Sequence, residues 1–495
     1  CDLIIEAIAE RLDWKEDLYK KIAPFVNDKA ILATNTSGLS ITAMANVLPE
    51  QLRSRFLGIH FFNPPRYMFM LELIPTEFTA PAVVDQLETF SASVVGKGVI
   101  RAFDTPNFVA NRVGVAGMLL TFREVEKSGL GYDIVDDLTG KKLGRASSAT
   151  FRTADVVGLD TMAHVIKTLQ DNLQGDPFYP SYATPAVLAG LIEKGALGQK
   201  AGAGFYKKAG KDILRLDPAT GEYVPAGGKA DPLVDRILKK PPAERLKLLR
   251  ESSHPQAKFL WAILRDAFHY AAVHLEAIAE TARDVDFAMR WGFANKMGPF
   301  ELWQSAGWAE VAGWIRDDIA AGKTLTNVPL PGWVFDLKSG VHTAEGSWSA
   351  KENLFKPPSS HPVYARQAFR ASVLGSNAAS AATGGTTVFE DEGVRLWHSS
   401  DGVLIVSFKS KLNVLGPLQI GGLHRALDIA ASDFQAVVVY QSGATEGGAF
   451  SAGADLQSMQ PMIQEHGLAI VEPEIRKLQS AFMRMKYSPV PVVAA

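Results

Sequence analysis

Cysteine is nearly absent from this sequence: its 495 residues contain a single one, Cys1. One cysteine excludes an internal disulfide framework and a cysteine-rich zinc site, so no metal site is predicted, and it suits a reducing compartment such as the cytoplasm, where we expect the protein. An excess of one charge is also lacking, because 51 basic residues face 53 acidic ones and the net charge is −2. This balance gives no electrostatic reason to expect nucleic acid or an anionic membrane as a partner.

Long hydrophobic runs are missing as well. We find no uninterrupted apolar stretch of about 18 residues, so no membrane span is predicted. The hydrophobic fraction of 47% and the charged fraction of 21% are those of an ordinary globular protein. Residues 1–8 look like a buried strand with no preceding turn or signal sequence, and residues 488–495 look like a strand with nothing after it. We therefore expect an internal piece of a longer polypeptide.

Strand and helix patterns divide the chain into several expected domains. The first hundred residues alternate apolar strands with amphipathic stretches, which predicts half of a doubly wound nucleotide-binding domain with mostly parallel strands covered on both faces. Helical periodicity then dominates, apart from an expected hairpin in "ILRLDPATGEYV", until a new βαβ-type domain begins. The predicted domains are residues 1–103, 104–252, 253–330, a Pro-, Gly-, Ser- and Ala-rich linker at 331–388, and 389–495.

The helical part contains two segments that resemble each other. In "FRTADVVG" and "FELWQSAG" a phenylalanine, Phe151 or Phe300, precedes by seven residues a glycine, Gly158 or Gly307. Each glycine is suited to end a helix. A duplicated helical domain is the natural interpretation.

One histidine lies where chemistry is expected. The strand "GIHFF" carries His60 near its end and would deliver its ring to the carboxyl edge of the sheet, where open α/β sheets bind ligands. Twelve residues later Glu72 lies in another apolar strand, where an unpaired carboxylate would be costly, so His60 is its expected partner. That carboxylate would fix the tautomer and leave the other ring nitrogen to exchange a proton near neutral pH. A satisfied structural histidine is the alternative.

Two other polar groups are open to more than one interpretation. In "ATNTSGLSI", Thr36 or Ser37 is suited to cap the following helix, and capping alone would explain the residue type. In "TPNFVANRVG", Asn111 and Arg112 interrupt an apolar helical stripe, and they could serve a site or a contact between helices.

Taken together, these motifs resemble a known family. "IIEAIAE", "ATNTS", "GIHFFNPP", "LELI", "DTPNFVANR" and "GQKAGAGFYKK" occur in the order found in the NAD-dependent 3-hydroxyacyl-CoA dehydrogenases of fatty acid β-oxidation, over residues 1 to about 210. The second helical segment, with "GPFELW", is similar to the duplicated domain of the multifunctional members. The resemblance implies a Rossmann-type sheet in part, then a duplicated all-α dehydrogenase C-terminal domain.

The resemblance also implies roles for single residues. His60 matches the general base, Glu72 the carboxylate that orients it, and Ser37 and Asn111 the residues that hydrogen-bond the substrate. Positions near the NAD cofactor are matched by Glu10, Lys15, Ser37, Asn63 and Lys200. The family's GxGxxG phosphate loop should lie upstream of residue 1.

The last hundred residues resemble a second family. "GGAFSAGADLQSM" at 447–459, after "SKLNVLGPL", is similar to the first half of the enoyl-CoA hydratase (crotonase) fold, which implies a partial crotonase-like α/β domain. Its oxyanion and CoA positions would be Ala452, Gly453, Ala454 and Asp455, with the Ala454 N–H as half of the oxyanion hole. The catalytic glutamates should lie beyond residue 495, so hydratase activity is not assigned to this piece.

The function implied by the resemblance is oxidation of (S)-3-hydroxyacyl-CoA to 3-oxoacyl-CoA with NAD+, within a bifunctional β-oxidation enzyme. The expected partner is an acyl-CoA substrate, while a homodimer and association with a thiolase are left open. A non-catalytic CoA-binding or assembly module and a protein that is mainly a hydratase are the alternatives.

Overall fold

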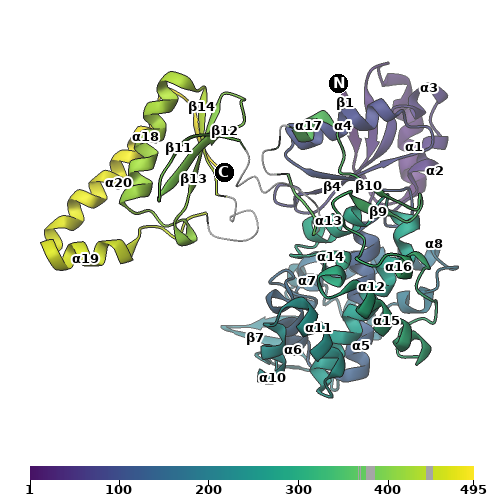
Figure 1. Cartoon of the computed structure of the whole chain (residues 1–495). Coiled ribbons are helices and arrows are strands. Elements are labelled where there is room, and N and C mark those ends of the chain that lie inside the picture. The colour runs from purple at the N-terminus through teal and green to yellow at the C-terminus, as the bar shows by residue number, and fades with distance from the viewer. Residues whose placement is uncertain (366, 368–369, 375–384, 442–449) are drawn as a thin grey trace. The chain divides into compact units, whose positions relative to one another are not determined.

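The structure is a computed structural model that describes residues 1–365, 367, 370–374, 385–441 and 450–495 (Figure 1). The chain forms two compact units, the first made mainly of residues 1–363 and the second mainly of the described residues from 385 on. No helix in these described ranges is both long and apolar enough to cross a membrane.

The first unit opens with a five-stranded sheet in the order β1-β2-β3-β4-β5, drawn in purple in Figure 1. Its strands are β1 (Leu3–Glu6), β2 (Ile31–Thr34), β3 (Phe56–Phe61), β4 (Met70–Pro75) and β5 (Gly98–Arg101), and its helices are α1 (Leu12–Ile22), α2 (Ile41–Asn46), α3 (Glu50–Arg53) and α4 (Pro81–Ser93). All neighbouring strands pair in parallel except β3 and β4, which are antiparallel. The predicted Rossmann-like sheet with mostly parallel strands is therefore confirmed.

Both faces of this sheet are buried, which explains why its strands are apolar along their whole length. Leu32 and Ile74 belong to one hydrophobic core, and Ile31, Leu57 and Leu71 belong to another. Successive side chains of a strand point to opposite faces, so the two cores lie on the two sides of the sheet.

Helices make up most of the rest of the first unit. The first set is α5 (Ala110–Ser128), α6 (Tyr132–Thr139), α7 (Phe151–Val157), α8 (Leu159–Asn172), α9 (Ala186–Glu193), α10 (Pro232–Leu238) and α11 (Pro242–Glu251), with a small sheet of β6 (Tyr206–Ala209), β7 (Asp212–Leu216) and β8 (Tyr223–Pro225). The second set is α12 (Pro255–Ile278), α13 (Ala282–Gly292), α14 (Pro299–Ser305), α15 (Trp308–Ala320), α16 (Trp333–Asp336) and α17 (Pro362–Ala365), with β9 (Ser347–Ser349) and β10 (Leu354–Lys356). The expected hairpin is present as antiparallel β7 and β8.

The two helical segments singled out in the sequence match in their contacts. Phe151 and Phe300 are fully buried, and the backbone N–H of each donates to a carboxylate 15 or 14 residues earlier, that of Asp136 (2.8 Å) or Asp286 (2.9 Å). Gly158 caps the end of α7, and Gly307 begins the turn into α15, with φ of 99° and 102°. Both conformations favour glycine.

Part of the predicted linker lies in the core of the first unit. Val334, Val341 and Trp348 are buried there. Their apolar side chains carry no helical or strand period, so the sequence pattern did not mark them as core. Residues 375–384 of the linker lie outside the described residues, and the domain boundaries stay predictions.

The second unit has a five-stranded sheet of its own, in the order β11-β12-β13-β14-β15. Its strands are β11 (Thr386–Glu390), β12 (Val394–His398), β13 (Val403–Phe408), β14 (Ala436–Val439) and β15 (Val492–Ala494), and its helices are α18 (Pro417–Asp433), α19 (Leu456–His466) and α20 (Val471–Lys486). The pairings from β11 to β13 are antiparallel and those from β13 to β15 are parallel. Residues of the strands, α18 and α20 form a separate hydrophobic core.

Candidate active site

The structure brings His60 and Glu72 together. The two residues face each other across the antiparallel ladder of β3 and β4, and His60 Nδ1 lies 2.7 Å from Glu72 Oε2. Both are buried, with 3% of His60 and none of Glu72 exposed. Phe62 and Phe108 flank the imidazole, with ring centroids 4.6 and 5.7 Å away. Within the described part of the chain no residue hydrogen-bonds the other ring nitrogen, Nε2, so it can meet a ligand.

Glu72 is fixed by a helix as well as by the histidine. Its Oε1 accepts the backbone N–H groups of Val109 (3.1 Å) and Ala110 (2.9 Å), which begin α5. Free N–H groups and the helix dipole at this end both stabilise a negative charge. The carboxylate therefore has three partners, and His60 is oriented by a group that the helical part holds in place.

Ser37 and Asn111 also lie next to each other. Ser37 follows β2, Asn111 lies in the first turn of α5, and the Asn111 amide nitrogen is 3.4 Å from the Ser37 carbonyl oxygen. Both side chains are partly exposed. The same turn of α5 thus contacts Glu72 through its backbone. Through a side chain it also contacts the segment between β2 and α2, residues 35–40, which we call the Ser37 loop.

The prediction that Thr36 or Ser37 caps the next helix is wrong. Ser40 is the N-cap of α2, and its hydroxyl accepts the N–H of Ala43. Asp104 supplies the rest of the cap, because its carboxylate accepts the N–H groups of Ile41 (2.9 Å) and Thr42 (2.7 Å). A cap provided by a residue more than 60 positions away cannot be read from local sequence.

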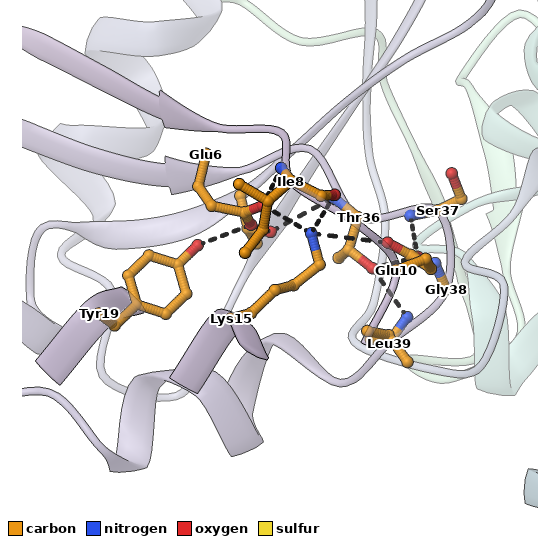
Figure 2. A network of polar contacts seen from close by, with 10 residues as sticks. Glu6, Ile8, Glu10, Lys15, Tyr19, Thr36, Ser37, Gly38 and Leu39 are labelled. Carbon is orange, nitrogen blue, oxygen red and sulfur yellow. Dashed lines mark hydrogen bonds and ion pairs between the residues drawn. The ribbon is translucent and has the colours of Figure 1, made fainter. Parts of the chain in front are cut away.

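Glu10 and Lys15 belong to one polar network at the carboxyl end of β1, which Figure 2 shows. Glu10 Oε1 accepts the N–H of Ser37 (2.7 Å) and the hydroxyl of Thr36 (2.5 Å). Lys15 is only 1% exposed, and its Nζ lies 3.6 Å from Glu10 Oε2 and 2.7 Å from Glu6 Oε1. Lys15 is therefore an interior residue between two carboxylates.

The other two residues predicted near the cofactor are less closely tied to this network. Asn63 is exposed in the loop after β3, and Lys97 holds that loop through the carbonyl oxygens of Pro65 and Met68, at 2.5 and 2.6 Å. Lys200 pairs with Asp160 at 2.7 Å. No hydrogen bond or ion pair recorded for the described residues joins it to the Glu10 network.

Glu6 was missed in the sequence. It is 5% exposed at the end of β1 and takes part in the network through both oxygens. The signal that singled out Glu72, an acidic residue inside an apolar strand, was present in "LIIEAI" as well.

The predicted oxyanion positions lie in the second unit. Leu415 pairs with Ala454, and its N–H donates to the Gly453 carbonyl at 2.8 Å. Asp455 caps α19 by accepting the N–H groups of Gln457 and Ser458. Ala452 lies in the same loop, and its N–H donates to Leu412. The start of the quoted motif, residues 447–449, lies outside the described residues.

Comparison with known proteins assigns the first part of the chain. Residues 1–105 match the 3-hydroxyacyl-CoA dehydrogenase NAD-binding domain, and residues 108–208 match the 3-hydroxyacyl-CoA dehydrogenase C-terminal domain. The predicted family and its cofactor, NAD, are thereby confirmed for these domains.

Two curated relatives align over the entire chain. A "Probable 3-hydroxyacyl-CoA dehydrogenase" of Bacillus subtilis is 34% identical and covers 100% of this chain, which spans 60% of that protein. A "Putative fatty acid oxidation complex trifunctional enzyme" of Rickettsia felis is 28% identical and also covers 100%, and the chain spans 63% of it. The chain thus spans less than two thirds of both relatives.

A solved structure supports the fold. The crystal structure of 3-hydroxybutyryl-CoA dehydrogenase from Escherichia coli matches with a TM-score of 0.52 and 22% identity, over 68% of this chain and 82% of that one. This likeness concerns the arrangement of the backbone.

Proposed function

We propose that this chain, whose residues 1–105 and 108–208 belong to the 3-hydroxyacyl-CoA dehydrogenase family, oxidises (S)-3-hydroxyacyl-CoA to 3-oxoacyl-CoA with NAD+. The observation that carries the proposal is the buried pair of His60 and Glu72, 2.7 Å apart. In such a pair the carboxylate orients the imidazole, and the second ring nitrogen can take a proton.

The reaction uses the groups in the following way. His60 Nε2 accepts the proton of the 3-hydroxyl group, and Glu72 stabilises the imidazolium that forms. Ser37 and Asn111, which adjoin each other, hydrogen-bond the substrate oxygen and hold it against His60. NAD+, when bound, supplies the acceptor for the hydride that leaves C3.

The residues present fit this cofactor. The loops that leave β1, β2 and β3 carry Glu10, Ser37 and Asn63, and the side chain of each is partly or fully exposed. The carboxyl ends of parallel strands are where open α/β sheets hold nucleotides. Carboxylate, hydroxyl and amide groups there suit ribose hydroxyls and a carboxamide. Lys15 would act on the cofactor indirectly, through the neighbouring carboxylate of Glu10. Lys200 would approach the cofactor from the helical part of the first unit.

The test is NADH oxidation with acetoacetyl-CoA. We expect His60→Ala to lower kcat by about 10²–10⁴-fold, the usual effect of losing a general base. His164→Ala is the matched control, because His164 is an exposed histidine of α8. Reduction by His60→Ala at close to the parent rate would show that another group is the base. No reduction by the parent protein would favour the non-catalytic binding module.

A second candidate activity concerns the second unit. We propose that residues 389–495 are a crotonase-like domain that binds the CoA thioester through the Ala452–Asp455 loop. Two features support this: none of the hydrogen bonds recorded for the described residues uses the Ala454 N–H, and the alignment with a relative named for a trifunctional complex extends over these residues. Hydration of crotonyl-CoA by the intact protein, assayed without NAD, tests it.

The setting follows from the same family. We propose a cytoplasmic enzyme of fatty acid β-oxidation, which takes acyl-CoA and associates with a thiolase and with a second copy of itself. The name of the Rickettsia relative, a trifunctional enzyme of a fatty acid oxidation complex, supports association with other enzymes of fatty acid oxidation. Co-purification with a thiolase and light scattering of the purified protein test these associations.

A further inference from the structure

We infer that Glu6 is a positioning residue that keeps the Lys15 ammonium away from Glu10, so that Glu10 can hold the Ser37 loop. This inference rests on the proposed function, because Ser37 is assigned there to the substrate. Glu6 itself lies behind the site and touches neither Ser37 nor His60 in any contact recorded for the described residues.

The surroundings of Glu6 hold its carboxylate in one orientation. Oε1 accepts Lys15 Nζ at 2.7 Å and the Ile8 N–H at 2.6 Å, and Oε2 accepts the hydroxyls of Thr34 at 2.6 Å and Tyr19 at 3.1 Å. Burial raises the pKa of Glu6, but the hydrogen bonds from Lys15, Thr34 and Ile8 outweigh it and leave the pKa below its usual value. Glu6 is thus a fully bonded anion.

The Lys15 ammonium lies between two carboxylates but is closer to one of them, that of Glu6. Its Nζ is within hydrogen-bond distance of Glu6, while Glu10 Oε2, at 3.6 Å, lies beyond it. Figure 2 shows the ammonium between the two carboxylates. Because one buried ammonium faces two anions, removing the charge of Glu6 leaves Glu10 as its remaining counter-charge and draws the two together.

Glu10 cannot approach Lys15 without cost to the Ser37 loop. Its carboxylate already accepts the Ser37 N–H and the Thr36 hydroxyl, and Thr36 in turn accepts the N–H of Leu39 at 3.1 Å. A Glu10 turned toward Lys15 would release these groups. Glu6 therefore sets the conformation of the loop by competing for Lys15.

The experiment measures amide hydrogen exchange at Ser37 and Leu39, with the amides of β3 as the reference for intact folding. We expect Glu6→Gln to speed exchange at Ser37 by at least about tenfold, the loss of one charge-assisted hydrogen bond. Tyr19→Phe is the matched control, because it removes a hydrogen bond to the same carboxylate and leaves the ion pair of Glu6 with Lys15 in place, and it should change Ser37 exchange less than about twofold.

A rescue separates positioning from simple loss of packing. In the double variant Glu6→Gln with Lys15→Met no ammonium competes for Glu10, so exchange at Ser37 should return to the parent rate. Fast exchange in the double variant overturns the inference, as does parent-like exchange in folded Glu6→Gln. Should Glu6→Gln fail to fold, a folded double variant with a protected Ser37 supports the inference, and an unprotected or unfolded one overturns it.

Activity is measured alongside. We expect kcat/KM for acetoacetyl-CoA to fall about tenfold in Glu6→Gln, in line with one lost charge-assisted bond. If the parent protein shows no NADH oxidation, the proposed function fails, while hydrogen exchange still decides the role of Glu6.

Discussion

The two helical repeats of the first unit share a scaffold and differ in what the start of their long helix binds. Helices α5 to α8 correspond in order to α12 to α15, and the long helices α5 and α12 pack against each other. At the start of α5 the backbone N–H groups donate to the Glu72 carboxylate, and the Asn111 amide donates to the Ser37 carbonyl oxygen. At the start of α12 the His254 side chain caps the helix itself, by accepting the Gln256 N–H.

The comparison separates what the fold needs from what the site needs. Both repeats keep a buried aspartate, a buried phenylalanine and a glycine with positive φ, so these features serve the scaffold. Of the two repeats, the first alone contributes candidate site residues, Asn111 and Lys200. The second repeat supports it from behind, since Tyr270 and His274 of α12 bond to Arg112 and Asp176.

A further difference concerns the partner of the buried aspartate. Tyr206 donates its hydroxyl to Asp136 (2.8 Å), whereas His342 Nε2 lies 2.6 Å from Asp286. His342 also contacts the Ser347 hydroxyl at 2.9 Å. This histidine, acid and hydroxyl resemble a catalytic triad in type, but all three are buried, which makes them a structural network. The second repeat therefore has an imidazole, which can titrate between pH 7 and 4, where the first repeat has a phenol.

The largest effect expected concerns the two phenylalanines. Phe151→Ala and Phe300→Ala should each lower the free energy of unfolding by about 3–5 kcal/mol, the usual cost of a large buried cavity. Urea denaturation followed by circular dichroism measures the cost. Tryptophan fluorescence adds a local signal for the second repeat, because seven of the nine tryptophans lie between residues 261 and 348. A large loss of unfolding free energy in one variant and a small loss in the other would show that Phe151 and Phe300 are not equivalent.

An intermediate effect concerns acid. Burial lowers the pKa of His342 to about 4. Between pH 6.5 and 4, His342 is therefore protonated in the unfolded chain and neutral in the folded chain. The free energy of unfolding carries no penalty from His342 above pH 6.5, and it falls as the pH drops toward 4. His342→Gln should remove about 2–3 kcal/mol of this loss. Stability curves between pH 7 and 4 measure the slope.

Tyr206→Phe is the matched variant for that test. Burial raises the pKa of Tyr206, so the phenol itself does not titrate in this range. Its hydrogen bond lowers the pKa of Asp136, so the slope should change only through Asp136 and by less than in His342→Gln. Burial also raises the pKa of Asp286, and that of Asp136 to about 6, which stabilises the folded state on acidification. Both variants retain these carboxyls, so the slopes can be compared. Equal slopes in His342→Gln and the parent would contradict the prediction.

The smallest effect concerns the two glycines. Gly158→Ala and Gly307→Ala both force a side chain into positive φ, at a cost of about 1–3 kcal/mol. Gly158→Ala should cost more, because its Cβ would lie 3.0 Å from Asp160 Oδ1 and 3.3 Å from Lys200 Nζ, whereas nothing comes within 3.9 Å at Gly307. Thermal melts of both variants compare them, and a larger loss at Gly307 would reverse the ranking.

What could be predicted from the sequence followed from burial. Apolar strands imply a sheet covered on two faces, and a charged residue within such a strand implies a partner, which is why Glu72 pointed to His60. Contacts made over long separations left no local pattern. Asp104 capping α2, and the packing of Val334 and Trp348, depend on the folded path of the chain. Glu6 could have been found by the same burial argument that found Glu72.

The single antiparallel pairing in the first sheet constrains how this protein can evolve. His60 and Glu72 lie directly opposite each other in the pairing of β3 and β4. Residues could be inserted into or lost from the connecting turn without moving the dyad. A shift of one residue in either strand would send one of the two side chains to the far face and separate the pair, even though the sheet still folds. Insertions and deletions in homologues should therefore be confined to the turn.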